Sequence, residues 1–156
     1  HRTRRRQRQM CIRDRSGSFR ARQLHYTTHK FNSGNTDKVY VRFDSNGADS
    51  TPDNNNKKIA PYPGRLIKVL ARAESAPTQT EIALHSATDG NTDIPTSATG
   101  TAKTVVMGSA DTSYTFTFDA DANFGPGDII GLSFNPNSTP NIVIMTAVWE
   151  YDTFLD

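Results

Sequence analysis

The sequence predicts an all-β protein, folded as a single β-sandwich of the jelly-roll type with about six to eight antiparallel strands. Three observations predict this class. Apolar residues alternate with polar ones in several short segments, turn-rich polar loops separate these segments, and no segment spaces its apolar residues as an amphipathic helix does. The 156 residues, 35% of them hydrophobic, suit one domain with one modest core.

The first half of the chain contains three clear strand patterns, at residues 38–43, 66–73 and 80–85. In the first pattern Val39, Val41 and Phe43 share one face, as expected of a half-buried strand. The second pattern follows a turn that contains two prolines and places Ile67 on the same face as Val69. Weaker patterns predict further strands at residues 24–30 and 101–107.

The second half contains three more strand patterns, at residues 113–118, 128–134 and 141–151. The first is the clearest in the chain, because Tyr114, Phe116 and Phe118 lie on one face and hydroxyl residues on the other. The last is apolar on both faces. We therefore expect it to be a central strand or to lie at a subunit contact.

Charge divides the chain in two. Residues 1–22 contain nine arginines and one acidic residue, a net charge of +8, whereas residues 23–156 contain nine basic and fifteen acidic residues, a net charge of −6. An acidic surface repels phosphate, so we expect no nucleic-acid binding by the body. The single cysteine, Cys11, excludes an intrachain disulfide, and no run of about 18 apolar residues predicts a membrane span.

We expect residues 1–22 to form a disordered arginine-rich head and residues 23–156 to form the β-sandwich domain. Residues 6–15 resemble the translation of a sequencing adapter, which predicts that most of this head is an artefact. The alternative is a genuine arm that neutralises packaged nucleic acid, as in small jelly-roll capsid proteins.

The residue patterns predict no catalytic, cofactor-binding or metal site. His25 and His29 would lie roughly 13 Å apart on one face of a strand, too far to share an ion, so these two and His85 are predicted to be surface residues. Residues 119–123 begin like a calcium loop, but Phe124 occupies the place of the turning glycine and Ile130 the closing twelfth position. An acidic hairpin loop is the preferred interpretation, and residues 89–93 carry a similar weak signal.

Two aromatic residues are candidates for surface binding, since exposed aromatic rings stack on sugars in sandwich-type carbohydrate-binding modules. Tyr62 lies in a loop between two prolines, and Trp149 lies near the end of the last predicted strand. For Trp149, packing in the core is the preferred interpretation, and Tyr62 is the better candidate for a surface contact.

Five segments of the chain, taken in order, resemble the small β-sandwich virion proteins of marine tailed bacteriophages. They are residues 59–69, 82–90, 114–118, 124–133 and 148–151. The resemblance spans about residues 38–152. It implies a non-catalytic component of a particle, such as a head decoration or fibre module, and it supplies no catalytic residue.

We therefore expect a non-enzymatic virion protein that acts by assembly or surface binding, without a cofactor. It should form homo-oligomers, with a trimer favoured by the viral analogy. Its expected partners are other virion proteins and possible glycans, and its place in the head or in the tail of the particle is left open. A carbohydrate-binding module and a small capsid protein with a nucleic-acid-binding arm are the alternatives.

Overall fold

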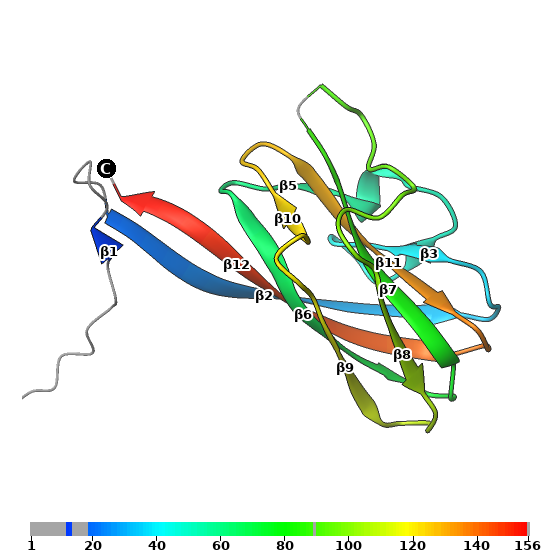
Figure 1. Cartoon of the computed structure of the whole chain (residues 1–156). Helices are drawn as coiled ribbons and strands as arrows, with labels where there is room; N and C mark the ends of the chain where they lie inside the picture. The colour runs from blue at the N-terminus through cyan, green and yellow to red at the C-terminus, as the bar shows by residue number, and fades with distance from the viewer. Residues whose placement is uncertain (1–11, 14–18, 89, 156) are drawn as a thin grey trace, which may run out of the picture.

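The computed structural model describes residues 12–13, 19–88 and 90–155 as two antiparallel sheets packed face to face (Figure 1). The β12 sheet has the strand order β1-β2-β12-β6-β10, with β9 also paired to β6. The β11 sheet has the order β4-β3-β11-β7-β8, with β5 also paired to β11. No α-helix occurs among the described residues, and the all-β sandwich prediction is confirmed.

All eight predicted strands are present. The β12 sheet contains β1 (Ile12–Arg13), β2 (Phe19–Ser33), β6 (Gly64–Ala73), β9 (Ser113–Thr117), β10 (Asn123–Phe124) and β12 (Asn141–Leu155). The β11 sheet contains β3 (Val39–Val41), β4 (Ala48–Asp49), β5 (Lys58–Ile59), β7 (Thr78–Ala87), β8 (Lys103–Met107) and β11 (Ile129–Pro136). The strands β4, β5 and β10 and a short 3-10 turn (Asn54–Asn56) lie within segments expected to be loops.

The core lies between the sheets and consists of alternate residues of the long strands. On β12 the buried residues include Val143, Met145, Ala147 and Trp149, none of them measurably exposed. Burying one large apolar side chain contributes about 1.5–3 kcal/mol. The last predicted strand is central, because β12 pairs with β2 on one side and β6 on the other.

Because β6 contains a β-bulge, the face predicted for Ile67 differs from the observed one. Trp149 lies opposite Leu66 and Val148 opposite Lys68, so Ile67 has no partner in the ladder. This extra residue places Leu66, and not Ile67, on the buried face together with Val69. The prediction that Ile67 shares the face of Val69 is therefore wrong.

The strands β2 and β12 pair over 15 residues each and extend beyond the sandwich as a two-stranded ribbon that carries β1 near its end (Figure 1). Since β2 begins at Phe19, the boundary expected between residues 22 and 23 falls inside a strand. Residues 1–11 and 14–18, with Cys11 and most of the adapter-like segment, lie outside the described residues. Within the described part, no helix is long and apolar enough to cross a membrane.

Candidate functional site

The outer face of the β12 sheet carries large apolar side chains that no other part of the described chain covers. Leu24 and Tyr26 of β2 are 67% and 74% exposed, and Ile142 and Ile144 of β12 are 39% and 49% exposed. Val148, directly opposite Tyr26, is half-buried beside them. We call this set, with Leu70 of β6, the apolar outer face.

This face is hollowed where the three strands meet. A shallow depression of about 500 Å³ is lined by Leu24, His25, Tyr26, Lys68, Leu70, Thr146 and Val148. Its walls are mostly apolar, because Leu24, Tyr26, Leu70 and Val148 supply most of their surface. Ion pairs from Glu150 to Arg65 and Arg22 lie at one end of the apolar residues. A patch of this kind is typical of a surface that contacts another protein.

The outer face of the β11 sheet differs, because the loop formed by residues 90–102, which we call the covering loop, packs against part of it. Ile94 of this loop packs against Gly131 so closely that a Cβ there would lie 2.4 Å from the isoleucine Cδ1. The backbone amide of Thr99 donates a hydrogen bond to the carbonyl of Leu84 at 2.7 Å. The covering loop therefore belongs to the folded body.

His85 lies beneath the covering loop, which contradicts its predicted place on the surface. It is not measurably exposed. Its Nδ1 donates to the carbonyl of Ser97 at 2.9 Å, so the neutral Nε2 accepts from the Ser133 hydroxyl at 2.8 Å. Burial lowers the pKa of His85 to about 4, so the imidazole is neutral at pH 7.

His29 is also buried, at 3% exposure, so its surface prediction is wrong, whereas His25 is exposed as predicted. The His29 Nδ1 donates to the Arg42 carbonyl at 2.8 Å, and its Nε2 accepts from the Thr27 hydroxyl at 2.9 Å. Burial is the largest cause that lowers the pKa of His29. The surface prediction failed for His29 because the face of β2 on which it lies points into the sandwich.

Trp149 lies in the core, as its preferred interpretation expected, so it is not available as a surface-binding residue. Its ring is fully buried, and its Nε1 donates to the Thr27 hydroxyl oxygen at 2.9 Å. The Lys58 amino group lies 5.4 Å from the centre of the tryptophan ring. Tyr62 is 44% exposed in its loop, so a role in binding stays a prediction for that residue alone.

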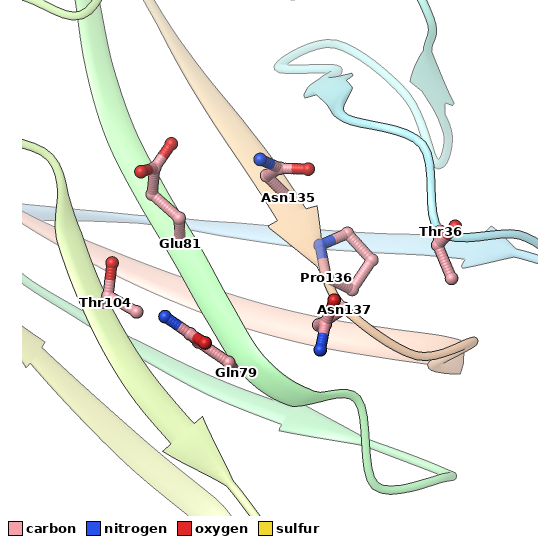
Figure 2. A pocket seen from close by; sticks show the side chains of 7 residues that line it. All are labelled: Thr36, Gln79, Glu81, Thr104, Asn135, Pro136 and Asn137. Atoms are coloured by element: carbon pink, nitrogen blue, oxygen red, sulfur yellow. The ribbon is translucent and has the colours of Figure 1, made fainter.

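A polar hollow of about 340 Å³ lies on the part of the β11 sheet that the covering loop leaves open (Figure 2). Its lining residues are Thr36, Gln79, Glu81, Thr104, Asn135, Pro136 and Asn137. The strand register places Asn135, Glu81 and Thr104 directly opposite one another on β11, β7 and β8. Sequence reasoning missed this group, although its amides and carboxylate alternate at residues 79 and 81 and at 135 and 137.

The described residues contain no group of three or more His, Cys, Asp or Glu side chains that could hold a metal ion. In the calcium-like segment, Asp121 accepts a hydrogen bond from the Thr101 hydroxyl and Asp119 pairs with Lys103. These two carboxylates thus fix the loop to the start of β8. Asp89, in the second weak segment, lies outside the described residues.

No family model matches the chain, and no curated protein matches it. Among solved structures, a protein of Bacillus endospore appendages, which are disulfide-linked pili, is 9% identical, with 91% of this chain and 94% of that chain covered and a TM-score of 0.42. A capsid structure of Helicobacter pylori bacteriophage KHP30 is 8% identical, covers 87% and 96%, and has a TM-score of 0.42. A family 30 carbohydrate-binding module is 8% identical, covers 87% and 76%, and has a TM-score of 0.37. These values establish no family.

Proposed function

We propose that this protein is a non-catalytic structural subunit of a virus particle and that it assembles through its apolar outer face. One observation carries the proposal: four large apolar side chains are 39–74% exposed on one face of the sheet, as two neighbouring pairs along β2 and β12. The sequence resemblance to virion proteins of tailed bacteriophages supports the virion as the place of assembly. The partners are other copies of this chain and other virion proteins.

Charge supports a protein partner over nucleic acid. Residues 23–156 have a net charge of −6, and Lys68 is the one cation among the residues that line the depression of the apolar outer face. A surface that binds nucleic acid needs several phosphate contacts from lysine or arginine. Apolar side chains instead gain free energy when another apolar protein surface excludes water from them.

The composition of the two outer faces also favours assembly over carbohydrate binding by stacked aromatic rings. Trp149 is buried in the core, so the two candidate aromatic residues do not share a surface. Tyr26, at 74% exposure, lies among aliphatic side chains, and no other described Phe, Tyr or Trp side chain lines the same depression. We extend the proposal to three copies, which the viral resemblance favours.

Sedimentation velocity at micromolar concentration tests this function. We expect the unaltered chain to sediment at about three times its monomer mass of 17.2 kDa. The double variant Leu24→Ser/Tyr26→Ser should sediment as a monomer, because it removes the two most exposed side chains of the apolar outer face.

The matched control is Ile59→Ser, which removes a side chain that is 68% exposed but lies in β5 on the other sheet. This variant should keep the oligomeric state of the unaltered chain. An unaltered chain that stays monomeric, or an oligomer that Ile59→Ser disrupts and the double variant does not, would contradict assembly through this face.

A further inference from the structure

The polar hollow begins where the covering loop ends, and the chemistry of the sheet changes at that point. Beneath the loop, Ala83 and Ser133 lie opposite each other and are only 1% exposed. Two residues further along the same face, Glu81 and Asn135 lie opposite each other and are half-buried. The uncovered part of the sheet is thus a recess beside the loop, lined by polar side chains.

Figure 2 shows the side chains that line this recess, which come from separate segments. Gln79 and Glu81 come from β7, Thr104 from β8, and Asn135 from β11. Neighbouring strands lie about 4.8 Å apart, so the row from Asn135 through Glu81 to Thr104 spans about 10 Å. The volume of about 340 Å³ is within the range of small-molecule sites.

The hydrogen-bonding groups of these side chains are not used within the described chain. The side chains of Gln79, Glu81 and Asn135 have no hydrogen bond or ion pair to any described residue. Elsewhere, comparable groups are engaged: Asn56 donates to Asp49 at 2.9 Å. Two amides and one carboxylate therefore offer free donors and acceptors side by side on rigid strands.

The charge of the hollow selects a ligand class. Glu81 is its one charged residue, and no lysine, arginine or histidine is among the described residues that line it. An anionic ligand would meet a carboxylate without a compensating cation. A neutral ligand with adjacent hydroxyl groups would instead donate to the carboxylate and exchange hydrogen bonds with the amides.

An apolar contact is also in reach of such a ligand. Val106 of β8 lies opposite Gln79 and is 66% exposed on the same face. A sugar ring presents hydroxyl groups at its rim and C–H groups on its faces, so it matches a polar row flanked by an exposed valine.

We propose that the polar hollow binds a neutral saccharide, with Glu81 and Asn135 as the central hydrogen-bonding pair. This inference does not rest on the proposed assembly, since the hollow lies on the opposite sheet from the apolar outer face. Without an aromatic ring to stack on the sugar, binding to one monosaccharide should be in the millimolar range.

Backbone amide NMR of the full chain tests the site with four neutral probes, the methyl glycosides of glucose, galactose, mannose and N-acetylglucosamine, and with glucose 6-phosphate as the charged probe. We expect at least one neutral probe to shift the amide signals of residues 79–81, 104–106 and 135–137 in a saturable way. Glu81→Ala and Asn135→Ala should each weaken this binding about tenfold.

The control is Glu74→Ala, which removes an exposed carboxylate at the end of β6 and should leave saccharide binding unchanged. Both site variants should fold, because neither side chain has a partner in the described chain, and their remaining amide spectra report this directly. The proposal is overturned if no neutral probe shifts these signals, if the shifts lie elsewhere, or if glucose 6-phosphate binds at least as tightly. Unchanged sedimentation of the site variants separates this result from the assembly proposal.

Discussion

Lowering the pH from 8 to 5 is expected to destabilise the fold through His85. The folded protein holds this imidazole neutral, because it is fully buried and its Nε2 accepts the hydrogen bond of Ser133. Protonation would place a charge under the covering loop, where Lys38 lies close enough to disfavour it further. Unfolding returns the side chain to water and to its ordinary pKa.

The size and sign of the effect follow from the two pKa values of His85. Its pKa is about 4 in the folded state and about 6.5 in the unfolded state, so the unfolded chain takes up the proton first. The contribution is fully present above pH 6.5 and is lost as the pH falls towards 4. At about 1.4 kcal/mol per pKa unit, the full loss is about 3 kcal/mol, of which about 2 kcal/mol is reached at pH 5.

Urea denaturation at pH 8 and pH 5, followed by the fluorescence of the single tryptophan, measures this difference. The two curves are compared under conditions in which the protein has the same oligomeric state at both pH values. The variant His85→Gln should lose about 2 kcal/mol of the pH dependence, while His25→Gln, at an exposed position, should keep all of it. The lowered pKa of His29 acts in the same direction and remains in both variants. A His85→Gln variant with the full pH dependence of the unaltered chain would refute the reasoning.

Two further predictions concern contacts made in the interior by Gly131 and Thr27. Gly131→Ala should lower the free energy of unfolding by about 1–3 kcal/mol, since the new Cβ would lie 2.7 Å from the carbonyl oxygen of Asn56. Urea denaturation at pH 8 measures this change, and an unchanged stability would contradict the prediction. Thr27→Val removes the acceptor of the Trp149 Nε1 and should cost about 1–3 kcal/mol in the same assay, whereas Thr28→Val, on the exposed face, should cost much less.

Local sequence patterns predicted the strands because the period of two is a property of each strand by itself. The alternation through Tyr114, Phe116 and Phe118 needed no knowledge of the partner strand, and β9 was found at its observed place. The face of Ile67 could not be predicted in this way. Its position depends on the bulge in the pairing of β6 with β12, which is a contact between distant segments.

The buried histidines and the polar hollow depend on tertiary contacts in the same sense. Along β7, His85 alternates with apolar residues that face the core. The strand face on which His85 lies would be exposed without the covering loop. Glu81 and Asn135 are 54 positions apart, and the register of β7 with β11 alone brings them together. The sequence contained the residues of both features, but no local pattern indicated their neighbours.

The two outer faces differ in the kind of contact that would cover them. Buried polar groups need partners at defined positions, and the covering loop supplies one to His85 through the Ser97 carbonyl. On the apolar outer face, Leu24, Ile142 and Ile144 have no polar group that demands a specific partner. What these side chains gain from a cover is the exclusion of water, which any complementary apolar surface provides. In the proposed assembly this surface comes from another subunit, because no other part of the described chain covers this face.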